Sequence, residues 1–311
     1  MPKPSGKSHS IEMESIIAPE NPMIVEMLSP AKINLFLDIA GLREDGYHRL
    51  TLVNAKVSLQ DRIACRLIPP PEIQLTANGL PIPLDSSNTA HHAARRFRDL
   101  YGLPLGVRIH IEKQIPQGAG LGGGSSNAAA VLTALNQLTG NQVPIETLRE
   151  CGARIGADVP FFLYEGCCLC EGIGEQVTPL PVPSPEGESP LRVVLCHPDE
   201  HVSTPRAYAL WDQAGNPPHA SPQPLIQALK NQNWERVPGC LFNAFESVIF
   251  ANYPVIQQAY EVFRNISPTP PRLTGSGSNL YSLHTRREEA IEVANGLEQQ
   301  GLRATVCDLI L

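Results

Sequence analysis

The stretch Gly118-Ala119-Gly120-Leu121-Gly122-Gly123-Gly124-Ser125-Ser126 contains more glycine than the interior of a helix or strand would favour, because glycine destabilises both. The run from Val107 to Ile111 just before it alternates apolar and polar residues, which is typical of a strand. From Asn127 to Leu138 the apolar residues recur at helical spacing. The sequence therefore predicts a strand, a glycine loop and a helix.

Such a loop is suited to an anionic ligand. Without Cβ atoms its backbone N–H groups can approach a phosphate closely, and the unpaired N–H groups of the next helix carry about half a positive charge. A Walker A loop would end in Gly-Lys-Ser/Thr, which this stretch lacks. A dinucleotide motif can be read in Gly118, Gly120 and Gly123, but the acid nearest the required distance is Glu146, which opens a helix. A flexible turn with serine N-caps would seldom need so many glycines, so a nucleotide triphosphate site is favoured.

Three segments resemble the GHMP small-molecule kinases. The loop is similar to their P-x-G-x-G-L-G-S/G-S-S ATP motif, and 273–278 (Leu-Thr-Gly-Ser-Gly-Ser) is similar to their third motif. Their first motif resembles Ala31-Lys32-Ile33-Asn34-Leu35 together with Asp45-Gly46-Tyr47-His48. The Gly-Tyr-His part and 156–160 (Gly-Ala-Asp-Val-Pro) narrow the likeness to members that phosphorylate a cytidine-diphosphate-linked polyol. The resemblance runs from about Val25 to the C-terminus.

The resemblance implies an α+β, two-domain GHMP kinase fold, with an N-terminal ribosomal-protein-S5-like domain and a C-terminal ferredoxin-like domain. We expect a disordered tail over 1–22, an ATP-binding and catalytic domain over 23–178, and a C-terminal domain over 191–311. The proline-rich segment from Thr178 to Pro190 reads as the connection between the domains.

The resemblance also implies roles for individual residues. Lys32 and Asp158 would be catalytic, Asp158 as the base and Lys32 as the cation beside it. The ATP-binding residues would be Pro116, Gln117, Gly118, Ala119, Gly120, Leu121, Gly122, Gly123, Gly124, Ser125 and Ser126. The substrate-binding residues would be Asn34, Tyr47, His48, Thr204, Tyr208, Gly275, Ser276 and Gly277.

By pattern alone these residues have plainer interpretations. Lys32 and Asn34 could be solvent-facing residues of a strand, Asp158 a capping or turn residue, and Tyr208 a helix residue packed in a core. ATP and Mg²⁺ are the implied cofactors. Ser125 or Ser126 could contact the metal, but the glutamate that other GHMP kinases use cannot be identified, so no metal ligand is assigned.

Composition limits the class of protein. A chain of 311 residues favours two domains, and 42% apolar with 18% charged residues is typical of a globular protein. The net charge of −7 disfavours a nucleic-acid partner.

Eight cysteines at this length predict reduced thiols, and the Cys167–Cys170 run is read as a buried strand and not a metal site. The first two dozen residues resemble no signal or transit peptide, and no apolar run is long enough for a membrane span. We expect a cytoplasmic enzyme with a small-molecule cytidine diphosphate substrate, as a monomer or weak homodimer.

Two rival functions stay open. A different GHMP kinase, such as a homoserine kinase, would share the loop but would not be expected to have Asp45-Gly46-Tyr47-His48. A non-catalytic nucleotide-binding relative would keep the loop and lose Lys32 or Asp158, and this chain retains both.

Overall fold

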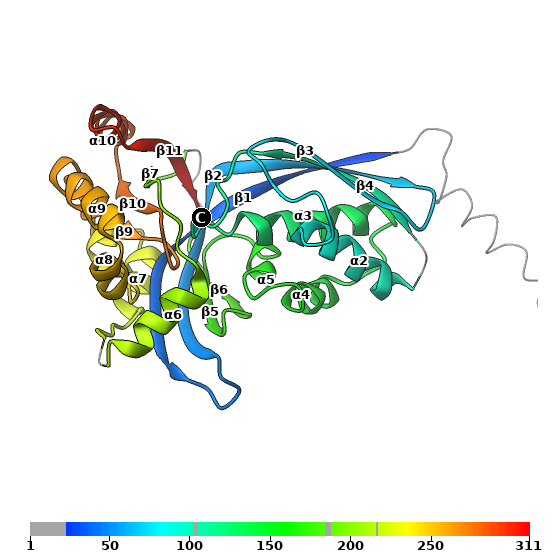
Figure 1. The fold of residues 1–311 in the computed structure, drawn as a ribbon, viewed down its shortest axis with the longest axis horizontal. Coiled ribbons are helices and arrows are strands. Elements are labelled where there is room, and N and C mark those ends of the chain that lie inside the picture. Colours follow the sequence, from blue (N-terminus) through cyan, green and yellow to red (C-terminus); the bar gives the residue numbers. More distant parts are fainter. Residues whose placement is uncertain (1–22, 103–104, 184–187, 216) are drawn as a thin grey trace, which may run out of the picture. The chain divides into compact units, whose positions relative to one another are not determined.

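The structure, a computed structural model, describes residues 23–102, 105–183, 188–215 and 217–311 (Figure 1). The predicted tail, 1–22, lies outside the described residues. The chain divides into two compact units: unit 1 has residues up to 29, 60–114 and 124–163, and unit 2 has 30–59, 115–123 and 164–311. The sequence predicted one boundary between 178 and 191. That boundary stays a prediction. The chain passes between the two units several times, because strands β1 (Ile24–Leu42) and β2 (His48–Ile68) supply residues to both.

Unit 1 is a sheet with helices packed on one of its faces. Its strands are β1 (Ile24–Leu42), β2 (His48–Ile68), β3 (Ile73–Gly79) and β4 (Gly106–Lys113). β4 pairs antiparallel with the end of β2 and parallel with β3, so it lies between them. The helices are α2 (Thr89–Tyr101), α3 (Gly123–Leu138), α4 (Ile145–Ala153) and the short α5 (Val159–Phe162).

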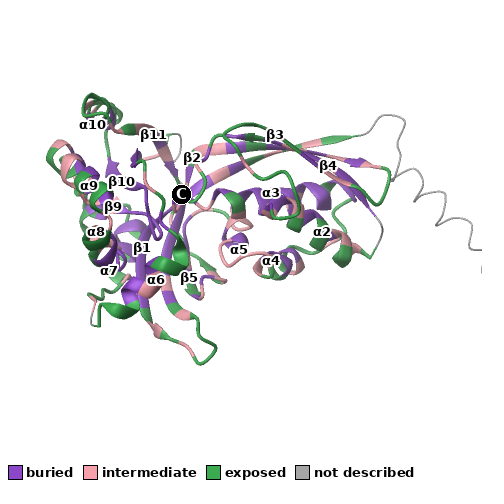
Figure 2. Ribbon diagram, viewed as in Figure 1, coloured by how far each residue is buried: buried purple, intermediate pink, exposed green. Residues whose placement is uncertain are grey.

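The core of unit 1 follows from strand alternation. Ile63 of β2 and Ile109 and Ile111 of β4 are fully buried, and they pack with Phe97 of α2 and Leu132 of α3. Side chains alternate along a strand, so the neighbours of each isoleucine point to the opposite face of the sheet. In Figure 2 most of α3 is coloured as buried, whereas α2 has buried and exposed residues in turn.

In unit 2, β11 (Arg303–Ile310) pairs with the middle of β2 and with β7 (Arg192–His197), and β7 pairs with β10 (Leu280–His284). Its further strands are β5 (Cys168–Gly172), β6 (Gln176–Pro179), β7 (Arg192–His197), β8 (Phe242–Asn243), β9 (Arg272–Leu273), β10 (Leu280–His284) and β11 (Arg303–Ile310). Its helices are α6 (Thr204–Gln213), α7 (Gln223–Lys230), the 3₁₀ helix η1 (Trp234–Cys240), α8 (Glu246–Asn252), α9 (Pro254–Ile266) and α10 (Arg287–Gln299).

The strand and helix that the sequence predicted around the glycine loop are confirmed, with differences in length. Asn88 and Gly102 also predict the limits of a helix, because asparagine favours the N-cap and glycine the C-terminal end. Helix α2 begins after Asn88, whose side chain accepts a hydrogen bond from the N–H of Ala90, and ends at Gly102 with positive φ. The apolar residues over 23–28 and 33–39 predict two separate strands, but the structure has one continuous strand, β1, which runs through Ser29 and Pro30. The sequence did not predict β3, which follows the triple proline.

Candidate active site

The glycine loop has a backbone that only glycine adopts easily. Gly118, Gly120 and Gly122 have φ of +64°, +74° and +67°, in the left-handed region where a Cβ is unfavourable. Helix α3 begins at Gly123, four residues before the predicted start at Asn127. The last loop residues therefore form the first turn of α3, whose N–H groups have no partner within the helix.

We call 118–124 and 273–278 the two glycine segments. They contact each other within unit 2, at Gly120 and at Thr274 and Gly275. A Cβ on Gly120 would lie 2.1 Å from the carbonyl oxygen of Thr274, and a Cβ on Gly275 would lie 3.1 Å from the Cα of Gly120. The Thr274 hydroxyl also donates to the carbonyl oxygen of Gly120 over 3.3 Å. The structure thus brings the first part of the predicted ATP loop against the segment that contains Gly275, Ser276 and Gly277.

A buried set of polar side chains lies beside this contact. Lys32 is 4% and Asn34 is 2% exposed. Lys32 Nζ donates to Asn34 Oδ1 over 2.7 Å, and Asn34 Nδ2 donates to Asn54 Oδ1 over 2.6 Å. The backbone N–H of Asn34 donates to Thr274 Oγ1 over 3.2 Å. We call Lys32, Asn34, Asn54 and Thr274 the Lys32 network, and it fixes where the Lys32 ammonium lies.

Asn34 therefore has a contact that its predicted role did not include. Its amide binds Lys32 and Asn54, and its carbonyl oxygen accepts from the Tyr281 hydroxyl over 2.8 Å. A direct contact of Asn34 with substrate stays a prediction. In this structure Asn34 orients Lys32, because its Oδ1 accepts a hydrogen bond from the Lys32 ammonium.

The segment after β9 is held by two residues that the sequence did not single out. Asn243 Nδ2 donates to the carbonyl oxygens of Leu273 and Gly275 over 2.8 and 2.9 Å. Glu246 accepts from the N–H of Leu273 over 2.9 Å and pairs with Arg272. Burial raises the pKa of Glu246, and Arg272 opposes that rise. Asn243 and Glu246 therefore hold the backbone of Leu273 and Gly275, at the start of the second glycine segment.

Aromatic rings gather around His48. The His48 and Tyr208 rings are stacked, with centroids 4.5 Å apart and planes 15° apart, and Trp211 meets His48 edge-on at 5.6 Å. His48 Nε2 bonds Asp212 Oδ1 over 2.7 Å. We call His48, Tyr208, Trp211 and Asp212 the His48 cluster. The predicted substrate-binding residues His48 and Tyr208 thus contact each other, and the sequence missed Trp211 and Asp212.

A similar pair flanks Trp211 on another side. His219 Nδ1 bonds Asp38 Oδ1 over 3.0 Å, and the His219 ring meets Trp211 at 6.3 Å. Among the described residues, the buried Nε1 of Trp211 has no hydrogen-bond partner. An indole N–H is a donor only, so it could serve a ligand that offers an acceptor.

Tyr47 is placed less tightly than His48. Its residue is 60% exposed and lies at the turn between β1 and β2. Asp45 holds that turn by accepting hydrogen bonds from Arg43 and from the N–H of Tyr47, and these bonds lower the pKa of Asp45.

Two other predicted substrate-binding residues, Thr204 and Ser276, lie side by side. Their hydroxyl oxygens are 3.1 Å apart, within hydrogen-bonding distance.

Asp158 belongs to unit 1, at the start of α5. Its side chain makes no capping hydrogen bond to that helix, so the plain interpretation as a cap is not supported. It is neither buried nor fully exposed. Lys32 belongs to unit 2, and the pairing of Lys32 with Asp158 stays a prediction.

The two loop serines differ in their surroundings. Ser126 is 1% exposed, and its hydroxyl accepts from the hydroxyl of Ser29 over 2.8 Å. The next residue, Asn127, donates to Asp61 over 2.8 Å, and Asp61 is paired with Lys113. Burial lowers the pKa of Lys113, and Asp61 opposes that change. Ser126 is therefore part of a buried structural network, and Ser125, which is partly exposed, is the better candidate for a metal-bound hydroxyl.

The described residues contain no group of three or more His, Cys, Asp or Glu side chains placed to hold a metal ion. Mg²⁺ commonly keeps several waters and binds through one or two protein oxygens together with substrate phosphates. A partly exposed serine at the end of a phosphate loop fits that mode of binding.

The cysteine run forms part of β5, as predicted. Cys168 and Cys170 lie in that strand and are buried, as is Cys167 just before it. Cys167 is a free thiol, and burial raises its pKa.

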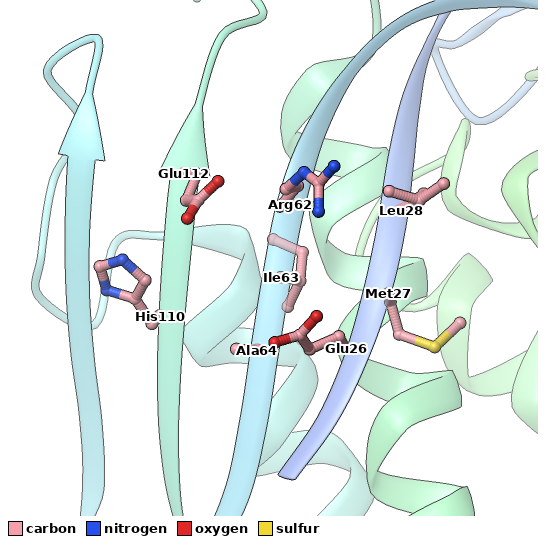
Figure 3. A pocket seen from close by; sticks show the side chains of 8 residues that line it. All are labelled: Glu26, Met27, Leu28, Arg62, Ile63, Ala64, His110 and Glu112. Carbon is pink, nitrogen blue, oxygen red and sulfur yellow. The ribbon is translucent and has the colours of Figure 1, made fainter.

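A groove of about 260 Å³ lies on the sheet of unit 1 (Figure 3). Its walls come from β1, β2 and β4: Glu26, Met27, Leu28, Arg62, Ile63, Ala64, His110 and Glu112. Arg62 and Glu112 are register partners, an arrangement common on sheet surfaces. None of the predicted site residues lines this groove. In the described part of the chain, no helix has the length and apolar character of a membrane span.

Sequence comparison identifies close relatives. The family model for the GHMP kinases N terminal domain matches residues 88–166. A 4-diphosphocytidyl-2-C-methyl-D-erythritol kinase of Caldicellulosiruptor saccharolyticus is 36% identical over 281 residues, which are 89% of this chain and 95% of the relative. The kinase of the same name from Geobacter sp. strain M21 is 37% identical over 88% of this chain and 95% of its own length.

Solved structures agree with the sequence relatives. A crystal structure of 4-(cytidine 5'-diphospho)-2C-methyl-D-erythritol kinase has a TM-score of 0.75 and 33% identity, and covers 92% of this chain and 100% of that one. Homoserine kinase from Cytophaga hutchinsonii has a TM-score of 0.72 at 19% identity, and covers 92% of this chain and 95% of that one. The second likeness shows the fold alone. The predicted GHMP kinase fold is confirmed.

Proposed function

Because the chain belongs to the family of 4-diphosphocytidyl-2-C-methyl-D-erythritol kinases, we propose that it transfers the γ-phosphoryl group of ATP to the 2-hydroxyl of 4-diphosphocytidyl-2-C-methyl-D-erythritol. The products would be the 2-phosphate and ADP, in the non-mevalonate route to isoprenoid precursors. The observation that carries the proposal is the contact between the two glycine segments at Gly120 and Thr274, with the buried Lys32 ammonium in the same hydrogen-bonded network. We also propose that the protein is cytoplasmic.

Phosphoryl transfer depends mainly on positioning and on neutralising charge. The N–H groups of Gly120 to Ser126 would bind the ATP phosphates, since their glycines leave no Cβ in the way. Mg²⁺, held in part by Ser125, would neutralise phosphate charge. These roles need a fixed loop, and the Thr274 contact at Gly120 supplies one constraint on it.

The chemical step makes one P–O bond and breaks another. The substrate 2-hydroxyl oxygen attacks the γ-phosphorus, the bond from that phosphorus to the bridging oxygen of ADP breaks, and the hydroxyl proton passes to the Asp158 carboxylate. Lys32 would stabilise the oxygen as its negative charge grows. Asn34 keeps the ammonium in place by accepting a hydrogen bond from it, so Lys32 does not have to be ordered during the step.

The cytidine would bind at the His48 cluster. Tyr47 and Tyr208 would stack on the cytosine, and a ring nitrogen of His48 would bond its polar edge. The His48 plane is 15° from the Tyr208 plane, so a base bonded in the plane of the imidazole would lie nearly parallel to the Tyr208 ring. Stacking alone does not separate cytosine from uracil, and replacing His48 by Phe should erode that preference.

The decisive test of the chemistry is Asp158→Asn. We expect kcat to fall by about 10²–10⁴-fold, the usual size of general-base catalysis, with little change in KM because the lost interaction belongs to the transition state. A coupled ADP-release assay with the cytidyl substrate measures both constants. Asp99→Asn is the matched control, since Asp99 is an exposed residue of α2. If Asp158→Asn keeps kcat within a few-fold of wild type, Asp158 is not the base.

The same assay separates this proposal from the rival kinase. A chain that phosphorylates homoserine and leaves the cytidyl alcohol unchanged would refute the proposed substrate. A chain that binds ATP but transfers phosphate to neither would be a non-catalytic relative.

A further inference from the structure

We propose that Asp212 is a positioning residue that selects cytosine over uracil by fixing the proton on Nε2 of His48. The inference rests on the proposed function for its substrate, and on the His48 cluster for its geometry. Asp212 Oδ1 lies 2.7 Å from His48 Nε2, which is a short distance for a hydrogen bond from nitrogen to a carboxylate.

An ionised aspartate can only accept hydrogen bonds, whereas neutral imidazole has one donor and one acceptor nitrogen. The contact with Asp212 therefore assigns the proton of neutral His48 to Nε2. Nδ1 is left with a lone pair in the plane of the ring. The tautomer of a histidine is commonly set by the bond that its other nitrogen makes.

That lone pair distinguishes the two pyrimidines. Cytosine carries an amino group at position 4, which can donate to His48 Nδ1. Uracil carries a carbonyl oxygen there, so two acceptors would face each other without a proton between them. A site built to bond a donor rejects an analogue that lacks it, because the site's polar atom is left unpaired.

The rings around His48 keep its plane in place. Tyr208 stacks on one face, and Trp211 meets the ring edge-on. The His48 side chain is only 9% exposed, whereas Asp212 is 50% exposed. Asp212 can therefore be changed from the solvent side of the cluster without opening the packed rings.

The test substitution is Asp212→Asn, which keeps the shape of the side chain. An amide can accept through its oxygen or donate through its nitrogen, so it no longer excludes the other tautomer. We expect the cytidyl-over-uridyl ratio of kcat/KM to fall about tenfold, close to the value of one hydrogen bond. The change should appear in KM for the cytidyl substrate, with kcat and KM for ATP as in wild type. Asp212→Glu should restore most of the ratio.

The matched control is Asp38→Asn. Asp38 forms the other aspartate–histidine pair beside Trp211, with His219. If the ratio depends on the tautomer of His48, Asp38→Asn keeps it at the wild-type value. An equal fall in both variants would mean that loss of any carboxylate near Trp211 disturbs the site, and it would overturn the proposal.

A spectroscopic measurement tests the tautomer without turnover. Histidines labelled with nitrogen-15 are followed by long-range proton–nitrogen correlation at about pH 8, where an ordinary imidazole is neutral, and His48 is assigned from the signals lost in His48→Phe. We expect the Nε2–H tautomer in wild type and a mixture in Asp212→Asn. An Nδ1–H tautomer or an imidazolium in wild type, or an unchanged selectivity ratio in Asp212→Asn, would overturn the proposal. If wild type phosphorylates neither nucleotide substrate, the proposed function fails, and the tautomer result still reports on the Asp212 contact.

Discussion

The Lys32 network and the His48 cluster are held in opposite ways. In the network, Lys32 and Asn34 are almost fully buried, at 4% and 2% exposed, and each is fixed by hydrogen bonds to other buried groups. The cluster is held by ring packing, and its Asp212 is half exposed. A buried polar group that loses its partner carries a full desolvation cost, whereas a half-exposed group is compensated by water. Substitutions should therefore have large effects in the network and graded effects in the cluster.

The largest effect should come from Lys32→Met, which keeps a long unbranched side chain and removes its charge. We expect kcat to fall by about 10²–10³-fold, as when one group that stabilises transition-state charge is removed. Steady-state kinetics measure it, and thermal unfolding of the same sample controls for stability. The variant also leaves Asn34 Oδ1 without its lysine donor, so Asn34→Leu serves as the comparison. If Lys32→Met lowers kcat no more than Asn34→Leu does, the charge has no special role.

The next largest effect should come from Gly120→Ala. Its Cβ would lie 2.1 Å from the Thr274 carbonyl oxygen, so the two glycine segments must separate. Overpacking of this kind costs about 1–3 kcal/mol, and we expect ATP affinity by calorimetry to fall about a hundredfold. Gly301→Ala is the control, because Gly301 has φ of +78° and no atom within 4 Å of its Cβ position. Equal ATP affinity in the two variants would count against the loop as the phosphate site.

The sequence predicts features that depend on neighbouring residues, but not contacts between residues far apart in the chain. The helix limits at Asn88 and Gly102 and the glycine loop follow from local residue types, and the structure has them at the predicted places. Asn34 and Thr274 bond each other across 240 residues, and a local pattern contains no information on such a pair. The predicted role of Asn34 therefore lacked its contact with Lys32.

The start of α3 differs from the prediction for a related reason. Glycine has low helix propensity, so the pattern placed the helix start after the last glycine, at Asn127. The structure starts it at Gly123, where the hydroxyl of Thr89 donates to the carbonyl oxygen of Gly124 over 2.7 Å. Asp212 was missed because one aspartate on a helix has no distinctive spacing, and only the fold brings it to His48.

Within the His48 cluster, Tyr208→Ala should have the largest effect. Tyr208 stacks on His48 and meets Phe245 edge-on at 5.0 Å. Base stacking on an aromatic ring is worth about 1–3 kcal/mol by alanine substitution, so KM for the cytidyl substrate should rise about ten- to a hundredfold. KM for ATP should stay near wild type. Tyr208→Phe keeps the stacking ring and should retain the wild-type KM, and a rise in both KM values would indicate a core residue and not a substrate contact.

The smallest effect should come from Tyr47→Ala. Tyr47 would supply the second ring of the cytosine stack, but it is 60% exposed and lies on a turn held by Asp45 and Arg43. Ordering an exposed side chain on binding costs about 0.5–1.5 kcal/mol, which offsets part of the stacking energy that Tyr208, already packed, retains. We therefore expect KM for the cytidyl substrate to rise about fivefold, less than for Tyr208→Ala, with Tyr47→Phe unchanged. Titration of cytidine diphosphate against the four tyrosine variants gives the same order without turnover. A Tyr47→Ala effect larger than that of Tyr208→Ala would show that prior packing of the ring does not set its contribution.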